Sequence, residues 1–224
     1  MQQTIQTSFA DLLTQAGDQF DPDLVAFFSS EETLSFHFQC ADPQSPTGLL
    51  IYLSPKPGAG VPAGWLEVLS EYNLAWIGAE NMGNDVHVAR RVGAALLAPI
   101  AAASVIEVDS SRCLLSGFSG GGRVASMMMP MYGARYCGAL FMCGANPLMA
   151  ATEQAIADLQ RLPMVFLTGT GDFNHDDTHM AISTYWQAGL SRAELTVVDG
   201  LDHALPEPAD LAEIMARIFN RPET

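Results

Sequence analysis

From residue 48 onward, the chain alternates short apolar runs with longer segments that have the periodicity of amphipathic helices. A short continuous apolar run is typical of a strand buried on both faces, and such strands separated by helices form parallel sheets. The sequence therefore predicts an α/β fold, with a mostly parallel central sheet flanked by helices on both faces. The six expected strands are residues 49–53, 74–77, 113–115, 139–142, 164–168 and 195–198. The expected helices are residues 65–71, 86–97, 122–131, 152–162, 177–188 and 209–219.

The residues before this region follow a different pattern. Residues 4–28 are predicted to be helical, with turn signals at Gly17 and at Asp21 followed by Pro22. Residues 33–40 alternate apolar and polar side chains, which predicts an outer strand with one solvated face. We expect this strand at the edge of the sheet, where it could run antiparallel to the others.

Charge excludes some classes of partner. The chain has 10 Lys and Arg against 25 Asp and Glu, a net charge of −15, and Lys56 is its single lysine. Binding to nucleic acid or to an anionic membrane requires clustered cations, which this sequence lacks. We therefore expect a small-molecule substrate, with no nucleic-acid or membrane partner. The oligomeric state is left open.

The sequence also indicates where the protein works. Its longest apolar run, residues 94–106, is interrupted by Pro99 and is shorter than the roughly 20 residues that a spanning helix needs. Residues 1–10 lack the basic and apolar regions of a secretory signal, so a cytoplasmic location is expected. The four cysteines form no CxxC pair or zinc spacing, and free buried thiols are expected. They are Cys40, Cys113, Cys137 and Cys143.

A candidate nucleophile follows the strand predicted at residues 113–115. Residues 117–121 read Gly-Phe-Ser-Gly-Gly, a G-x-S-x-G pattern that places Ser119 between a strand and a helix. A serine on such a tight turn has a strained backbone with other chains close by, and glycines two residues away leave room for them. A Gly-rich structural turn is the alternative interpretation. A phosphate-binding loop is excluded because Arg123 and Val124 replace the required Lys and Ser or Thr.

Partners for this serine occur after two later strands. Asp172 follows the strand at 164–168, and His203 follows the strand at 195–198. The order Ser, Asp, His at successive strand ends is the one expected of a nucleophile, an orienting acid and a base in a hydrolase sheet. Taken alone, Asp172 could stabilise a turn or cap a helix, and His203 could be a surface residue. The rival acids are Asp176 and Asp177, which are better placed to cap a helix, and Asp202.

A tetrahedral intermediate also needs two N–H donors for its oxyanion. The first expected donor is the amide of Gly120, directly after the nucleophile. The second should follow the first buried strand, where the chain reads Ser54-Pro55-Lys56-Pro57. Proline has no N–H, so the amide of Ser54 or Lys56 remains, and Lys56 fits the usual offset better.

Two histidines raise the question of a metal. His175 and His179 are spaced i, i+4, which on a helix can bind zinc. In the metalloprotease pattern a glutamate follows the first histidine, whereas Asp176 stands there in this chain. We therefore expect neither a metal nor an organic cofactor.

These motifs resemble those of the α/β-hydrolase superfamily, and within it the esterases related to polyhydroxybutyrate depolymerases and feruloyl esterases. The matching positions are Gly64-Trp65, Gly83-Asn84, the Gly117–Arg123 turn, the Gly169–Asn174 segment and the late Gly200–His203 loop. The resemblance covers roughly residues 48–219, the expected catalytic core of a single domain over 1–224. Residues 1–47 would be an N-terminal helix and edge-strand region.

The resemblance implies Ser119 as nucleophile, His203 as base and Asp172 as acid. We therefore expect a serine carboxylesterase that forms an acyl-enzyme. The sequence shows no lid segment, and loops 54–64 and 79–85 are expected to form an open rim suited to small or short-chain esters. Thioesterase, amidase or peptidase activity from the same triad remains an alternative. A hydrolase-fold binding protein without turnover is another.

Overall fold

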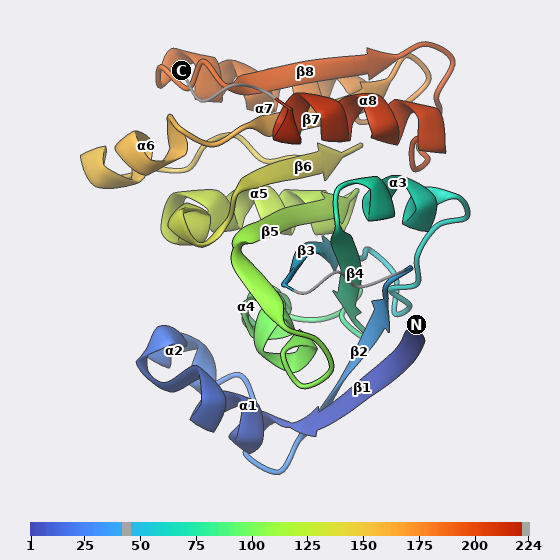
Figure 1. The fold of residues 1–224 in the computed structure, drawn as a ribbon. Helices are drawn as coiled ribbons and strands as arrows, with labels where there is room; N and C mark the ends of the chain where they lie inside the picture. Colours follow the sequence, from blue (N-terminus) through green and yellow to red (C-terminus); the bar gives the residue numbers. More distant parts are fainter. Residues whose placement is uncertain (42–45, 221–224) are drawn as a thin grey trace.

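The computed structural model describes residues 1–41 and 46–220, and its strands form one twisted sheet (Figure 1). The strand order is β1-β2-β4-β3-β5-β6-β7-β8. Strands β3 to β8 are parallel, whereas β2 pairs antiparallel with both β1 and β4. The strands are β1 (Gln2–Ser8), β2 (Thr33–Gln39), β3 (Thr47–Leu53), β4 (Leu74–Ala79), β5 (Val108–Phe118), β6 (Gly138–Met142), β7 (Met164–Gly169) and β8 (Ala193–Val198).

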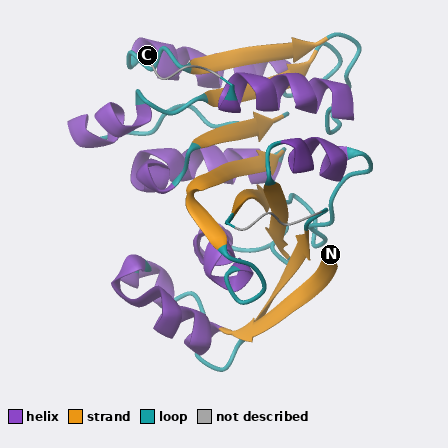
Figure 2. Ribbon diagram, in the orientation of Figure 1, coloured by secondary structure: helices purple, strands orange, loops and turns teal. Residues whose placement is uncertain are grey.

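Helices cover both faces of this sheet (Figure 2), so the predicted fold class is confirmed. Helices α1, α4, α5 and α7 pack on one face, and α3 and α8 pack on the other. None of the described helices is long and apolar enough to cross a membrane. The α-helices are α1 (Phe9–Ala16), α2 (Pro22–Val25), α3 (Trp65–Glu71), α4 (Val88–Ala102), α5 (Gly120–Tyr132), α6 (Glu153–Leu159), α7 (His175–Gln187) and α8 (Pro208–Phe219).

Strand β3 shows why the central strands are apolar throughout. Leu49 and Ile51 point into the core under α4 and α5, whereas Leu50 and Tyr52 point into the core under α3 and α8. Successive side chains of a strand alternate between its faces, so a strand between two helical layers must be apolar at every position. All of β3 is buried, and the continuous apolar run follows from that burial.

The prediction for the N-terminal residues was wrong in part. Residues 4–8, predicted to be helical, belong to strand β1, which pairs with β2. The strand predicted at residues 33–40 does run antiparallel, but β1 covers it, so it is not the edge strand. Ile5 is buried between exposed polar neighbours, a period of two that only a strand satisfies. Helix α1 begins after Ser8, whose hydroxyl accepts a hydrogen bond from the Asp11 amide at 3.0 Å.

At two points near the carboxyl ends of the strands, backbone segments pass so close to each other that only glycine fits. A Cβ atom on Gly121 would lie 1.9 Å from the carbonyl oxygen of Leu53, and one on Gly169 would lie 1.9 Å from that of Leu201. Both distances are well inside van der Waals contact, and both obstacles are backbone atoms that cannot rotate away. The first contact presses the start of α5 against the end of β3, and the second presses the end of β7 against the loop after β8.

Replacing Gly121 by alanine should therefore destabilise the fold. We expect Gly121→Ala to lower the free energy of unfolding by about 2 kcal/mol or more, because the added methyl forces β3 and α5 apart. Gly60→Ala is the matched control, since a Cβ atom there has no neighbour within 4 Å, and it should change stability by no more than about 1 kcal/mol. Urea unfolding measures both, and equal stabilities for the two variants would contradict the expectation.

Candidate active site

Ser119 lies at a sharp turn between β5 and α5. Its backbone has φ +55° and ψ −121°, a region that a non-glycine residue occupies at a cost of about 1–3 kcal/mol. Surrounding backbone holds the turn in place: the Ser119 amide donates to the Met142 carbonyl at 2.8 Å. A Cβ atom on Gly144 would lie 2.4 Å from the Ser119 carbonyl oxygen, so only glycine fits there. The strain raises the serine side chain above the strand ends.

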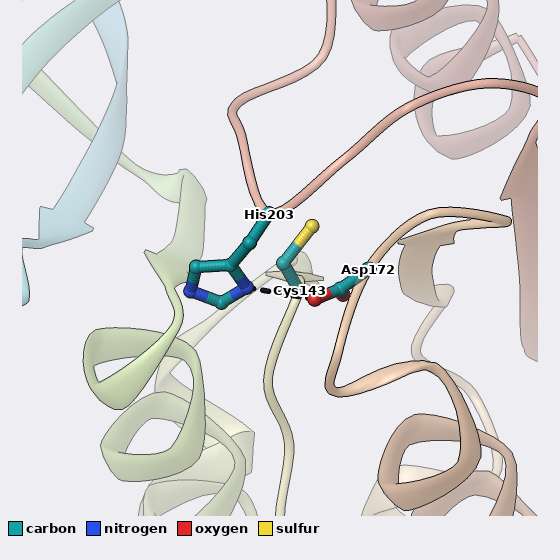
Figure 3. Close-up of side chains that lie close together, drawn as sticks. All are labelled: Cys143, Asp172 and His203. Carbon is teal, nitrogen blue, oxygen red and sulfur yellow. Dashed lines mark hydrogen bonds and ion pairs between the residues drawn. The ribbon is translucent and has the colours of Figure 1, made fainter.

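The structure brings the three predicted site residues together. Nε2 of His203 lies 2.9 Å from Oγ of Ser119, and its Nδ1 lies 2.7 Å from Oδ1 of Asp172. An ionised carboxylate only accepts hydrogen bonds, so Nδ1–H donates to Asp172 and Nε2 is left to accept the serine proton. Figure 3 shows the imidazole facing the carboxylate. The ring is held between the rings of Phe118 and Phe173, at centroid distances of 4.9 and 4.0 Å.

Asp172 is buried, and both of its carboxylate oxygens accept hydrogen bonds. Its Oδ1 accepts from the Asn174 amide at 3.0 Å, and its Oδ2 accepts from the Thr168 hydroxyl at 2.8 Å. Burial alone would raise the pKa of Asp172. The hydrogen bonds from Asn174, His203 and Thr168 outweigh burial, so the pKa lies below its ordinary value. The carboxylate is therefore charged at neutral pH and fixed in orientation.

Cys143 is a third neighbour of this pair and had no predicted role. It follows β6, has φ +51°, and places its thiol 3.3 Å from the Ala204 carbonyl (Figure 3). Burial and the Asp172 carboxylate raise the pKa of the thiol, which stays neutral and donates its proton in a hydrogen bond to the Ala204 carbonyl. Its position just after a predicted strand is the signal that could have placed it at this edge of the sheet.

The same three side chains form the one cluster of potential metal ligands among the described residues. Ligand atoms of Cys143, Asp172 and His203 lie within 4.8 Å of one another. Their donors and acceptors are already matched by hydrogen bonds, and the thiol would have to lose its proton to bind an ion. This arrangement suits an acid–base pair, and we assign no metal to it.

One of the two predicted oxyanion donors is well placed. Gly120 is the first residue of α5, so its N–H stands at the positive end of the helix beside Ser119. The amide of Lys56 instead donates to the Ser54 hydroxyl at 3.1 Å, and that hydroxyl donates to the Gly58 carbonyl at 2.6 Å. Because the short turn after β3 occupies the Lys56 N–H internally, the structure does not support Lys56 as the second donor.

A hollow of about 380 Å³ opens beside His203. Its walls are largely apolar, and its rim comes from the predicted loop at residues 54–64. The predicted loop at 79–85 does not line it. A larger hollow of about 590 Å³ lies at the other edge of the sheet, around Tyr72 and Phe219, and contains none of the three site residues. The hollow beside His203 is lined by Tyr52, Ser54, Pro55, Lys56, Gly58, Gly60, Phe118, His203, Ala204 and Leu205.

Comparison with known proteins identifies solved structures that share this fold. No family model matches the chain, and no curated protein does. Among solved structures, a ferulic acid esterase superposes with a TM-score of 0.68 at 13% identity, covering 98% of each chain. The protein Est1E from Butyrivibrio proteoclasticus gives a TM-score of 0.62 at 12% identity, covering 87% of this chain and 98% of its own. The S-formylglutathione hydrolase FrmB from Staphylococcus aureus gives 0.62 at 12% identity, covering 97% of each.

The chain has the α/β-hydrolase fold. Identities this low show the fold alone. Within the α/β-hydrolase fold, Ser119, Asp172 and His203 follow β5, β7 and β8 at the carboxyl edge, where ligands of open parallel sheets bind.

The rival acids lie elsewhere. Asp176 and Asp177 are in the first turn of α7, but neither caps it, because the N-cap residue is Asn174 and no side chain bonds the helix end. Asp177 instead pairs with Arg123 at 2.8 Å. Asp202 packs against Gly171, with its Oδ1 2.3 Å from where a Cβ atom would stand. Of the carboxylates in the described chain, Asp172 is the one paired with His203.

The two histidines of α7 do not form a metal site with any third described residue. The rings of His175 and His179 lie 4.4 Å apart, and Nδ1 of His175 is 3.1 Å from the Gly169 carbonyl. The i, i+4 spacing thus gives a ring contact at the start of the helix.

The lowered pKa of Asp172 makes stability depend on pH. Its carboxylate stabilises the folded chain at pH values above the unfolded pKa of about 3.9, and this contribution is lost as the pH falls through the lower folded pKa. We expect the free energy of unfolding to fall more steeply for the wild type than for Asp172→Asn as the pH drops from about 5 to below 3. Thr168→Val, which removes one donor, should give an intermediate slope in urea titrations. Identical slopes for all three proteins would contradict this linkage.

Proposed function

We propose that this protein is a serine hydrolase that cleaves small or short-chain carboxylic esters through an acyl-enzyme. One observation carries the proposal: the Ser119 hydroxyl lies 2.9 Å from a His203 nitrogen whose other side is bonded to buried Asp172 at 2.7 Å. A serine hydroxyl is a weak nucleophile, and an oriented base is what makes it reactive. Residues 48–219 supply all three side chains and would be the catalytic core of a single domain.

Acylation follows from the orientation of the imidazole. Oγ of Ser119 attacks the ester carbonyl carbon while its proton moves to Nε2 of His203. The resulting imidazolium is stabilised by Asp172, which stays ionised. When the tetrahedral intermediate collapses, the bond to the alkoxy oxygen breaks, and the proton on Nε2 passes to the leaving alcohol.

Deacylation repeats these steps with water. His203 takes a proton from a water molecule, whose oxygen attacks the acyl carbon. The carboxylic acid leaves, and the proton returns to Oγ of Ser119. In both halves the negative oxygen is stabilised by the Gly120 N–H and the positive end of α5.

The neighbours in fold support esters as the substrate class. One of them is named as a ferulic acid esterase. FrmB is named as an S-formylglutathione hydrolase, so thioesters form the second substrate class to test. The same serine and base would serve both, because only the leaving atom differs.

Removal of the nucleophile is the direct test. Ser119→Ala should lower the turnover of p-nitrophenyl acetate by about 10³–10⁶-fold, because no other group in the site can form the acyl-enzyme. Labelling by a fluorophosphonate probe, mapped by peptide mass spectrometry, should modify Ser119 in the wild type and be lost in the variant.

The control for this test is Ser111→Ala. Ser111 is exposed on the far part of β5 and should keep wild-type turnover and labelling. Equal turnover by the wild type and Ser119→Ala would overturn the proposal. A wild type that turns over no ester or thioester and takes no label would favour a binding protein with this fold.

Acyl length tests the size of the substrate. The hollow beside His203 holds about 380 Å³, enough for a short acyl chain. We expect kcat/KM for p-nitrophenyl acetate and butyrate to exceed that for p-nitrophenyl dodecanoate by at least about tenfold, since methylenes beyond the hollow gain no contact. A kcat/KM that rises steadily with chain length would show that the site takes long-chain lipids.

A further inference from the structure

The proposed chemistry needs a second donor for the oxyanion, and Asn84 packs against Gly120, the residue expected to supply the first. Asn84 is in the loop between β4 and α4, and its side chain is exposed. A Cβ atom on Gly120 would lie 2.1 Å from Oδ1 and 2.7 Å from Nδ2 of Asn84. The amide group thus packs directly on the residue that follows the nucleophile, in space left by the missing side chain of Gly120.

The Asn84 loop is tied to the turn after β3. The backbone N–H of Asn84 donates to the Pro55 carbonyl at 3.0 Å. A Cβ atom on Gly83 would lie 2.9 Å from the Lys56 carbonyl carbon, so the two loops touch through their backbones. Asn84 therefore occupies the position next to the expected oxyanion site that the amide of Lys56, bonded to Ser54, does not fill.

Arg91 determines which end of the Asn84 amide faces outward. Its Nη1 donates to Oδ1 of Asn84 at 3.2 Å. Its Nε donates to the Met82 carbonyl at 3.1 Å, and its Nη2 donates to the Ser54 carbonyl at 2.9 Å. A guanidinium can only donate, so the oxygen of Asn84 must face Arg91. The Nδ2 hydrogens are left for a ligand.

We propose that Asn84 is a catalytic residue that donates from Nδ2 to the oxyanion, together with the Gly120 N–H, and that Arg91 is the positioning residue that orients it. The inference rests on the proposed function, because an oxyanion forms only if Ser119 attacks a carbonyl. A side-chain amide is an established type of oxyanion donor, and removing one costs about 10²–10³ in kcat.

The burial of Arg91 fits this role. Arg91 is 5% exposed, and all three of its acceptors are neutral oxygens rather than carboxylates. Burial lowers the pKa of its guanidinium, and the negative charge of Asp85 opposes that shift. Burying a cation without a direct anionic partner costs several kcal/mol. Its three bonds join the loops after β3 and β4, and its charge lies behind the site where negative charge develops.

The test uses substitutions at Asn84, whose exposed side chain can change without opening the core. Asn84→Ala should lower kcat for p-nitrophenyl acetate by about 100-fold with KM changed by no more than about threefold, because the donor acts only in the transition state. Asn84→Asp is isosteric and places negative charge beside the oxyanion, so kcat should fall further. Inhibition by phenylboronic acid, which forms a tetrahedral adduct on serine, should weaken in parallel with kcat/KM.

The role of Arg91 is tested in the same assay. Arg91→Met should lower kcat toward the Asn84→Ala level, and the double variant should be little worse than either single variant because both act through one donor. Arg91→Lys, which keeps a buried cation, should recover part of the loss. Arg90→Met is the matched control, because Arg90 is the adjacent residue and pairs with Glu32 away from the site. It should leave kcat within about threefold of the wild type.

Ser119→Ala in the same series separates the two proposals. If Ser119→Ala is inactive while folded Asn84→Ala keeps kcat within about threefold of the wild type, the Asn84 inference is wrong and the proposed hydrolase function stands. If Ser119→Ala retains full activity, the proposed function fails first. If Arg91→Met does not fold, the Asn84 variants decide the matter alone. Equal inhibition of the wild type and Asn84→Ala by the boronic acid would also overturn the inference.

Discussion

The close approach of several backbones at Ser119 is the constraint on which the site depends. The serine occupies a strained conformation with φ +55°, and it can do so only because the neighbouring chains leave no room to relax. Gly121 lets α5 touch the end of β3, and Gly144 lets the loop after β6 touch the serine carbonyl. These contacts place the hydroxyl at the edge where His203 reaches it. A wider turn would lower the strain and move the hydroxyl away from its base.

Two buried charges are linked to this turn, Asp172 through His203 and Arg91 through Asn84. Asp172 is stabilised as an anion by donors from β7, from the residue before α7 and from the loop after β8, and it orients His203. Arg91 is a cation held by neutral carbonyl and amide oxygens, and it ties the loops after β3 and β4 together. A carboxylate beside the base and a cation behind the oxyanion suit a reaction in which positive charge forms on the imidazole and negative charge forms on the substrate.

The limits of the sequence prediction have local physical causes. Residues 4–8 of β1 give no apolar strand signal because they are mostly polar, and only pairing with β2 gives them a strand conformation. The first part of β5 is exposed and carries no apolar signal, so its start at Val108 was missed. The Lys56 amide is predicted from its offset from a strand, but the nearby Ser54 hydroxyl accepts the hydrogen bond from that N–H. In the sequence, Arg91 is one of two adjacent arginines on a predicted helix. Nothing in the pattern distinguishes the buried Arg91 from the partly exposed Arg90.

The sequence by itself determined the fold class, and it predicted Ser119, Asp172 and His203 as the site residues, because hydrophobic periodicity and glycine spacing are local properties that follow the chain. The tertiary structure alone decided how those residues meet, and it alone placed Cys143, Asn84 and Arg91 around them. Hydrogen bonds between residues far apart in the chain depend on which loops the sheet brings together. No local pattern encodes that choice, since the strand order β4-β3-β5 brings the loops after β3 and β4 to the start of α5.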